Sequence, residues 1–251
     1  MASICLKGVK RQLQSATAVF ELTVPSFDAS EGDIVAVVGN SGCGKSTLMD
    51  VLGLVSQPQS ADQFTIEATN THDVAVHWQK DELHQLTELR RKLLSYVMQA
   101  GGLFPYLSVR DNLLLPSRLK NIDVGENISL LVEAFNLVPP DDRDAQCAFY
   151  KKKPRHLSGG QRQRTAIIRA LLSEPLIILA DEPTAAVDGI TAEVIVAKFS
   201  QLAREHGIIV IMVSHDKALV KTVANRAYTF ELNSHGEHVS STVLETSVDQ
   251  L

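Results

Sequence analysis

A glycine-rich loop that directly follows a short apolar run limits the folds open to this chain. The run is Ile34–Val38, and the loop after it reads Gly39-Asn-Ser-Gly-Cys-Gly-Lys-Ser46, which matches G-x-x-x-x-G-K-S in full. Thr47 and the apolar residues after it are a good helix start. Between a strand and a helix, such glycines let backbone N–H groups turn inward at the positive end of the helix dipole. The segment predicts a phosphate-binding loop, called the P-loop below, within an α/β fold.

The P-loop also predicts roles for its side chains. Lys45 is expected to reach the β- and γ-phosphates of a nucleotide as part of the catalytic set, and Ser46 to ligate Mg²⁺. The residues expected to bind the nucleotide are Gly39, Asn40, Ser41, Gly42, Cys43, Gly44, Lys45, Ser46 and Thr47.

Two further apolar runs, Leu176–Ala180 and Ile208–Val213, are also rich in β-branched residues and lead into turn or helix signals. Uninterrupted apolar strands are buried on both faces, which is typical of a parallel sheet covered by helices. Weaker strand patterns at Ala18–Phe27, Phe64–Glu67 and Val74–Trp78 predict an antiparallel flank. The expected fold is an α/β core with this flank attached.

Helical spacing of apolar residues runs from Asp81 to Lys92 and again from Ser108 to Phe149, where Pro116, Pro139 and Pro140 interrupt it. The second block predicts a helical subdomain inserted into the core. We expect one domain over residues 1–251, with the core in about 1–100 and 161–251 and the helical subdomain in about 101–160.

Composition and net charge indicate the class of protein and the compartment in which it works. Its 251 residues are 45% hydrophobic and carry a net charge of −5, which is typical of a globular protein without the basic footprint of a nucleic-acid binder. The three cysteines have no disulfide or metal-ligand spacing, which fits a reducing compartment. The apolar runs are too short to span a bilayer. A cytoplasmic protein is expected, with any membrane role exerted through a partner.

The strand at Leu176–Ala180 ends in Asp181 and Glu182. Asp181 is positioned to hold Mg²⁺ directly or through water. Glu182 then projects toward an attacking water and predicts a general base, a role typically worth about 10² to 10⁴ in rate. Alone, this acid pair is as often a helix cap, but the P-loop upstream favours the catalytic interpretation.

A segment beginning Leu157-Ser158-Gly159-Gly160-Gln161 resembles the ABC signature and its following helix. Ser158 and the glycines cap a helix start, leaving a hydroxyl and N–H groups to face a second phosphate. The chain is therefore identified as resembling the ATP-binding subunits of ABC transporters along nearly its whole length. In that family two subunits pair head to tail and clasp each ATP between them, so Ser158–Gln161 would bind the partner's nucleotide.

The resemblance extends to three single residues in family order. Gln99 resembles the Q-loop glutamine that contacts the metal and relays motion to the membrane partner. Asp188 resembles the D-loop aspartate, and His215 resembles the switch histidine that contacts the γ-phosphate. The implied metal ligands are Ser46, Gln99 and Asp181, and the implied catalytic set is Glu182, His215 and Lys45.

The chain departs from the family pattern near its start. Family members usually stack adenine on an aromatic residue well upstream of the P-loop, but residues 1–19 contain no Phe, Tyr or Trp. We expect Phe20 to lie too close to the P-loop for that role, so base recognition is expected to be weak or built differently.

The segments Thr87–Lys92, Phe104–Leu113 and Leu115–Pro116 resemble the lipoprotein-release, macrolide-export and cell-division ATPase group. That resemblance implies a second ATPase subunit, expected to be identical, and a separate permease-like subunit with a periplasmic domain, reached from the cytoplasmic face of the inner membrane. Two alternatives stay open: a regulatory module that clamps ATP with little turnover, and a soluble ABC ATPase of DNA repair or translation.

Overall fold

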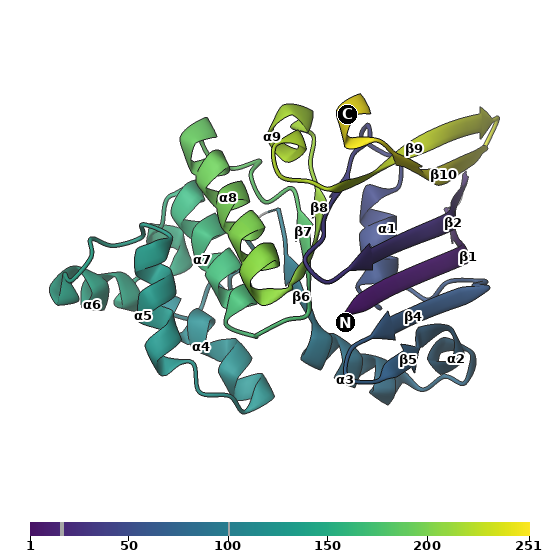
Figure 1. The fold of residues 1–251 in the computed structure, drawn as a ribbon. Helices are drawn as coiled ribbons and strands as arrows, with labels where there is room; N and C mark the ends of the chain where they lie inside the picture. Colours follow the sequence, from purple (N-terminus) through teal and green to yellow (C-terminus); the bar gives the residue numbers. More distant parts are fainter. Residues whose placement is uncertain (16–17, 100) are drawn as a thin grey trace.

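The computed structural model describes residues 1–15, 18–99 and 101–251, which form one ten-stranded sheet with helices around it (Figure 1). The strands are β1 (Ser3–Gln14), β2 (Val19–Ser30), β3 (Ile34–Val37), β4 (Gln63–Glu67), β5 (Thr71–Asp73), β6 (Leu94–Val97), β7 (Ile177–Asp181), β8 (Ile209–Val213), β9 (Arg226–His235) and β10 (His238–Thr246). The α-helices are α1 (Lys45–Leu52), α2 (Val74–Gln79), α3 (Leu83–Leu93), α4 (Val109–Lys120), α5 (Gly125–Ala134), α6 (Arg143–Lys151), α7 (Gly159–Leu171), α8 (Gly189–His206) and α9 (Lys217–Lys221).

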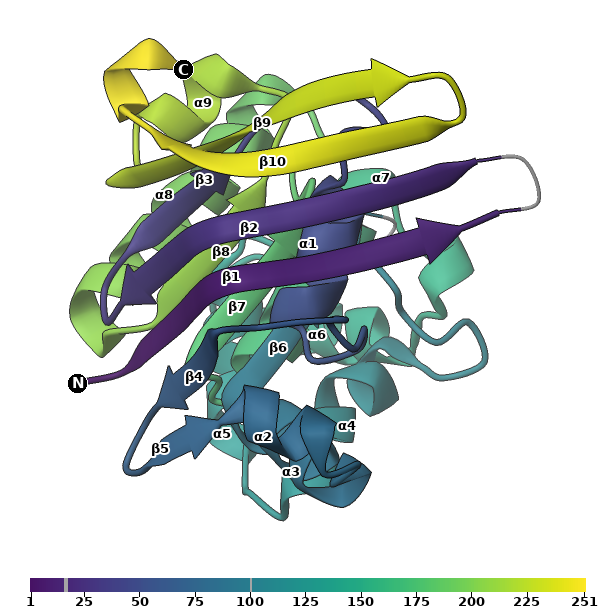
Figure 2. The ribbon, with the colours of Figure 1, turned by 90° about the vertical axis from the view of Figure 1, so that its right-hand side faces the viewer.

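The sheet joins a parallel part to an antiparallel part, in the order β5-β4-β1-β2-β10-β9-β3-β8-β7-β6. Strands β3, β8, β7 and β6 pair in parallel with one another, whereas β1 pairs antiparallel with both β2 and β4. Figure 2 shows the long β1–β2 and β9–β10 hairpins lying side by side, with α1 behind them. The expected α/β core with an antiparallel flank is confirmed.

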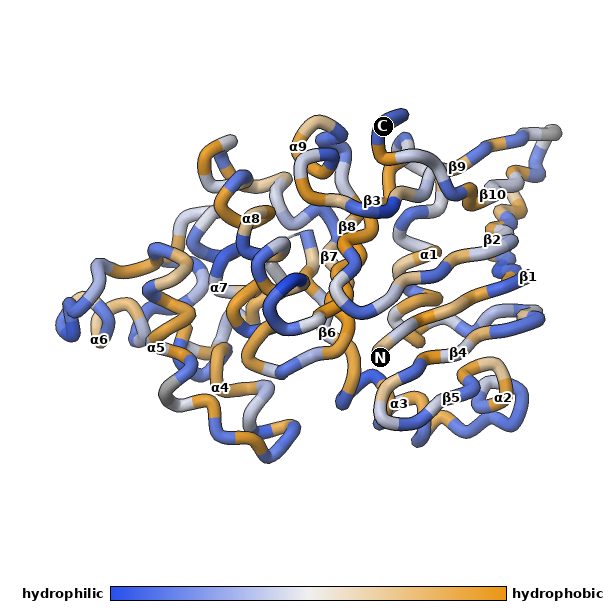
Figure 3. Tube along the Cα trace, in the orientation of Figure 1, coloured by the Kyte–Doolittle hydropathy of each residue, from blue (hydrophilic) through white to orange (hydrophobic). Residues whose placement is uncertain are grey.

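Alternate residues of the central strands face two separate hydrophobic clusters. In β3, Ile34 and Ala36 pack into the cluster on the side of α7 and α8, while Val35 and Val37 pack into the cluster that holds α1. Because both faces are buried, the strand needs apolar residues at every position, which is why its sequence shows no polar alternation. Figure 3 shows hydrophobic colouring along β8, whose five residues are all buried.

The helices α4, α5 and α6 lie together on the side of the molecule away from β1 and β2 (Figure 1). They fall within residues 101–160, the range that the sequence assigns to the helical subdomain, and the subdomain boundary itself stays a prediction. Buried residues of this group, such as Val109, Leu113 and Phe149, join the cluster on the α7 and α8 side. No helix formed by the residues that the structure describes has both the length and the apolar character to cross a bilayer.

The expected strand at Val74–Trp78 is wrong, because this segment forms the helix α2. Asp73 caps that helix, and its side chain accepts a hydrogen bond from the Val76 N–H at 3.0 Å. Val74 and Ala75 are both buried although they are adjacent, a pattern that one face of a strand cannot produce. The β-branched residues suggested a strand, and packing against β4 and α3 overrides that local preference.

Pro116 does not interrupt the helical pattern as expected but lies inside α4. A proline within a helix removes one backbone hydrogen bond and costs roughly 3 kcal/mol. The helix continues because Val109, Asn112 and Leu113 are buried on its inner side. The buried Asn112 amide also donates to the Phe104 and Ser108 carbonyl oxygens, which anchors the loop that leads into the helix.

Candidate functional site

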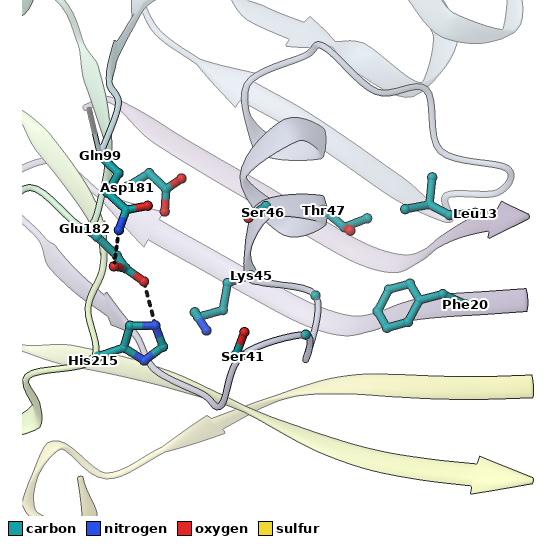
Figure 4. A pocket seen from close by; sticks show the side chains of 12 residues that line it. Leu13, Phe20, Ser41, Lys45, Ser46, Thr47, Gln99, Asp181, Glu182 and His215 are labelled. Atoms are coloured by element: carbon teal, nitrogen blue, oxygen red, sulfur yellow. Dashed lines mark hydrogen bonds and ion pairs between the residues drawn. The ribbon is translucent and has the colours of Figure 1, made fainter. Parts of the chain in front are cut away.

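A cavity of about 330 Å³ lies at the carboxyl ends of the parallel strands (Figure 4). Ligands of open α/β sheets bind at this edge because loops from neighbouring strands converge there. The lining residues lie on β1 and β2, at the end of β7, or in the segments that follow β3, β6, β7 and β8; they are Leu13, Phe20, Ser41, Gly42, Gly44, Lys45, Ser46, Thr47, Gln99, Asp181, Glu182 and His215.

The P-loop wraps the first turn of α1. Gly42 and Gly44 have φ angles of 79° and 102°, a left-handed backbone that L side chains rarely adopt. Gly44 also approaches β2 closely, since a Cβ atom there would lie 2.8 Å from Cζ of Phe20. The buried Lys45 donates from Nζ to the carbonyl oxygens of Gly39 and Asn40, both at 2.8 Å. Its ammonium group is thus held inside the loop, beside the cavity.

Not every residue of the predicted P-loop set faces the cavity. Gly39, Asn40 and Cys43 are absent from its lining. The Cys43 side chain is buried, and burial is the main cause that raises the pKa of its thiol. Its carbonyl oxygen accepts from Oγ of the buried Ser241 at 2.6 Å, which ties the loop to β10. These residues shape the loop rather than line the space inside it.

Asp181 ends β7 and Glu182 follows it at the edge of the cavity. Burial raises the pKa of the Asp181 carboxyl above its ordinary value, the Glu182 carboxylate adds to that increase, and Lys45 opposes it. Glu182 has a φ of 45°, a strained conformation for a residue with a side chain. Its N–H donates to the Val213 carbonyl oxygen at 3.0 Å, which fixes the turn against β8.

The Glu182 carboxylate contacts two residues from neighbouring loops (Figure 4). Oε1 lies 2.6 Å from Nε2 of His215, after β8, and Oε2 accepts from Nε2 of Gln99, after β6, at 2.9 Å. The structure therefore brings together the three residues that the sequence could only place at separate strand ends. Both oxygens of the carboxylate are engaged.

The donors in the cavity fit a magnesium ion. Mg²⁺ prefers oxygen ligands and keeps several waters. Ser46 has a hydroxyl, Asp181 a carboxylate and Gln99 an amide oxygen, and all three residues line the same cavity. Because the Gln99 nitrogen points to Glu182, its oxygen is left for another partner. These three residues would hold the ion.

The signature residues Ser158, Gly159, Gly160 and Gln161 do not line this cavity. Ser158 caps α7 in a capping box: its Oγ accepts from the Gln161 N–H, and its own N–H donates to Oε1 of Gln161, both at 3.1 Å. Asp188 likewise lies outside the lining and caps α8 by accepting from the Thr191 N–H at 2.9 Å. The chain thus has a second helix N-terminus away from its own P-loop.

Leu13 and Phe20 line the cavity but do not belong to the site that the sequence predicted. They face each other across the β1–β2 hairpin as a cross-strand pair. Phe20 was expected to be too close to the P-loop to contact a base, and the structure places it against Gly44 in the cavity wall. The strand register brings the two residues together. Their apolar character alone does not predict this pairing.

The fold and the P-loop are those of a phosphate-binding α/β protein. The oxygen donors that line its cavity suit a magnesium ion. Residues 22–185 match the ABC transporter family, and the chain belongs to that family. It is an ATP-binding subunit of the ABC type and an ATPase.

Relatives and a solved structure support the same family over most of the chain. The ABC transporter ATP-binding protein MJ0796 of Methanocaldococcus jannaschii is 35% identical over 217 residues, covering 85% of this chain and 87% of that protein. The lipoprotein-releasing system ATP-binding protein LolD of Bacteroides fragilis is 30% identical, covering 87% and 93%. The arginine transport ATP-binding protein ArtP of Escherichia coli is 34% identical, covering 93% and 90%. A dimeric MJ0796 structure bound to ADP and Pi superimposes with a TM-score of 0.75 and 30% identity over 98% of each chain.

Proposed function

We propose that this chain hydrolyses ATP as one half of a two-subunit cassette and thereby drives a separate membrane-spanning subunit of an exporter or mechanotransmission system. The observation that supports this most is the gathering of Lys45, Asp181, Glu182, Gln99 and His215 around one cavity. A cation, an acid at a strand end and a second acid with two polar partners are the parts that phosphoryl transfer to water requires.

The proposed roles follow from position in the cavity. Lys45 and the P-loop N–H groups bind the β- and γ-phosphates. A magnesium ion held by Ser46, Asp181 and Gln99 would neutralise charge that develops on the transferred phosphoryl group. Glu182 takes the proton of the attacking water at one of its carboxylate oxygens, whose present partners are His215 and Gln99. His215 then has its imidazole available for the γ-phosphate.

We place a second copy of the chain opposite the cavity. Ser158 at the start of α7 has no part in the cavity of its own subunit, and a helix N-terminus favours an anion. A head-to-tail pair brings this end of one subunit to the ATP of the other. The dimeric MJ0796 structure with ADP and Pi, which is similar over 98% of each chain, supports this arrangement.

The membrane partner is placed at the segment Gln99–Asp111, of which residue 100 lies outside the described residues. Three large apolar side chains in or beside this segment are exposed: Met98, Phe104 and Tyr106. The segment begins at Gln99, whose side chain contacts Glu182. A short helix from the partner that packs here would sense whether the cavity holds ATP. The location proposed with this contact is the cytoplasmic face of the inner membrane.

The test uses affinity-tagged Glu182→Gln with ATP and Mg²⁺, so that the closed complex accumulates, followed by purification from solubilised membranes. Recovery of a dimer of the chain with an integral membrane protein that has a periplasmic domain is the expected result. Glu193→Gln, an exposed acid on α8 outside the cavity, is the matched control and should keep full turnover.

Other outcomes separate the competing functions. A membrane partner without a periplasmic domain, co-purified with a solute-binding protein, would favour transport of a small solute, in line with the similarity to the arginine transport protein ArtP. Recovery of only soluble or ribosomal proteins would overturn the membrane function. Wild-type protein that binds ATP without releasing phosphate, even in its membrane complex, would instead favour the ATP-clamping module.

A further inference from the structure

A run of cations lies between α6 and the signature segment, and nothing in the nucleotide cavity accounts for it. The run reads Lys151-Lys152-Lys153-Pro154-Arg155 and is called the basic run below. Pro154 is buried and holds it against the protein, while Lys153 is half-buried and the other three residues are exposed. None of the five lines the cavity. The basic run therefore presents a fixed group of positive charges at the surface.

The cations of the basic run form no ion pair with any acid in the part of the chain that the structure describes. Asp111 lies within electrostatic reach of Lys153, but its carboxylate pairs with Arg118 at 3.6 Å. A shortage of acids is not the reason, because the chain has 29 Asp and Glu residues against 24 Lys and Arg residues. These charges are available to an anionic partner outside the subunit.

The basic run lies directly beside the segment at which we place the membrane subunit. Nζ of Lys153 donates to the Tyr106 carbonyl oxygen at 2.8 Å, and the Val109 N–H donates to the Lys152 carbonyl oxygen at 2.9 Å. Arg110, exposed in the first turn of α4, adds a further cation next to these contacts. Figure 1 shows α4 and α6 on the same side of the molecule. A membrane subunit bound at Tyr106 therefore brings the basic run toward the surface of the bilayer.

The distribution of charge favours one face of the chain for contact with that surface. The cytoplasmic leaflet is negatively charged and attracts clustered Lys and Arg, by about fivefold in binding for each residue that lies within a Debye length of ~8 Å. The net charge of the chain is −5, so a subunit without a fixed orientation is repelled. In α6 the acids Asp142 and Asp144 stand at the start, and the basic run follows from the end. This helix is therefore drawn to an anionic leaflet by its basic end.

We propose that the basic run binds the anionic lipid headgroups of the inner leaflet beside the membrane subunit and thereby orients the ATPase subunit against the bilayer. The inference rests on the proposed function, because the membrane subunit is what brings the basic run to the lipid. The docking segment supplies the attachment to protein, and the four cations supply a second, salt-sensitive attachment to the phosphate groups of the lipid. Clusters of four to eight cations next to a membrane attachment are typical of such binding.

Flotation of the purified chain with lipid vesicles tests this contact without the membrane subunit. Vesicles of phosphatidylcholine alone are compared with vesicles that also contain phosphatidylglycerol, at low and at raised sodium chloride. The chain should float with the anionic vesicles at low salt and be released at high salt. Absence of binding to the anionic vesicles at low salt, or equal binding to both kinds of vesicle, would overturn the inference.

Charge-matched variants locate the contact on the surface. Replacing the four cations of the basic run by glutamine should weaken binding to anionic vesicles by about tenfold or more. The matched control replaces by glutamine four exposed cations on β1, after α2 and on α8, namely Lys7, Lys10, Lys80 and Arg204. It has the same net charge and should bind much as the wild type does. Equal losses in the two variants would mean general electrostatic attraction and would contradict the assignment.

A smaller variant serves if the fourfold one does not fold. Lys151→Gln combined with Lys152→Gln changes two exposed positions and should weaken vesicle binding by about fivefold or more. Unchanged vesicle binding by this folded double variant would refute the contact. Sodium phosphate should release the wild type no better than sodium chloride of equal ionic strength, and stronger release would indicate a discrete phosphate site instead of a lipid surface.

Purification in detergent separates lipid from protein as the partner of the basic run. The double variant should recover the membrane subunit as well as the wild type does, and a loss there without any effect on vesicles would assign the run to an acidic protein segment. Failure of the proposed function has a different signature. In that case the tagged chain floats with anionic vesicles but recovers no membrane protein and releases no phosphate from ATP.

Discussion

Nε2 of His215 lies 2.6 Å from Oε1 of Glu182, and this contact spans the ends of two neighbouring parallel strands. The second carboxylate oxygen is engaged by Gln99. Each carboxylate oxygen keeps a further lone pair for a water, and a γ-phosphate that attracts His215 would release Oε1 from its present partner. Nucleotide binding is thus linked to the accessibility of the Glu182 carboxylate, the proposed general base, by direct contacts in the cavity.

His215→Ala is expected to lower the kcat for ATP hydrolysis by about 10²-fold, because it removes the group that we place between Glu182 and the γ-phosphate. The KM for ATP should change little, since the P-loop supplies most of the phosphate contacts. Phosphate release measured over a range of ATP concentrations separates the two constants. His84→Ala, an exposed histidine on α3, is the control, and wild-type kcat in His215→Ala would contradict the proposed role.

Ser158 and Ser108 are two similar helix caps, and comparing them tests the role of Ser158 in the ABC signature segment. Each caps a helix, with φ near −65° and an Oγ atom that accepts from the third residue's N–H at 3.1 Å. Replacing either by alanine should cost about 1 kcal/mol of folding stability, seen as a melting temperature about 2 to 4 °C lower. Only Ser158→Ala should also lose ATP turnover, by about tenfold or more.

The comparison between these two variants separates capping from phosphate binding. If both serines act only as helix caps, the two variants will show equal turnover. Turnover that falls in Ser158→Ala while the monomer still binds ATP would place the defect at the contact between subunits.

Asp181→Asn should stabilise the nucleotide-free protein while it abolishes magnesium-dependent turnover. Burial and Glu182 raise the pKa of Asp181 above its ordinary value of 3.8. The folded state therefore binds this proton more strongly than the unfolded state, and the free energy of unfolding falls as pH rises through the window above 3.8. The penalty grows as pH rises through the raised pKa of Asp181, and a neutral asparagine removes it.

Thermal denaturation at several pH values checks this expectation. The melting temperature of Asp181→Asn at pH 7 should exceed that of the wild type by about 2 °C, and the gap should shrink as pH is lowered toward 4. A gap that grows on acidification would have the wrong sign and would refute the assignment of the raised pKa.

The central strands were predictable because each is marked by an apolar run of a few consecutive residues. Every residue of β3 is buried on one face or the other, so an unbroken apolar run is required, and the P-loop follows it directly in sequence. The strained φ of Glu182 and the engagement of both its oxygens were not predictable, since they depend on loops from three strands meeting. The same holds for Leu13 and Phe20, which only the hairpin register unites.

Tyr106→Asp is expected to weaken attachment to the membrane subunit without changing the ATPase activity of the isolated chain. The side chain is 89% exposed, so the substitution should leave the fold intact, and it introduces a charge into an apolar docking surface beside Phe104. Recovery of the membrane protein with tagged chain should fall by about tenfold or more. Leu130→Asp is the matched control, because Leu130 on α5 is 65% exposed but lies outside the docking segment. Equal recovery with both variants would place the partner elsewhere on the surface.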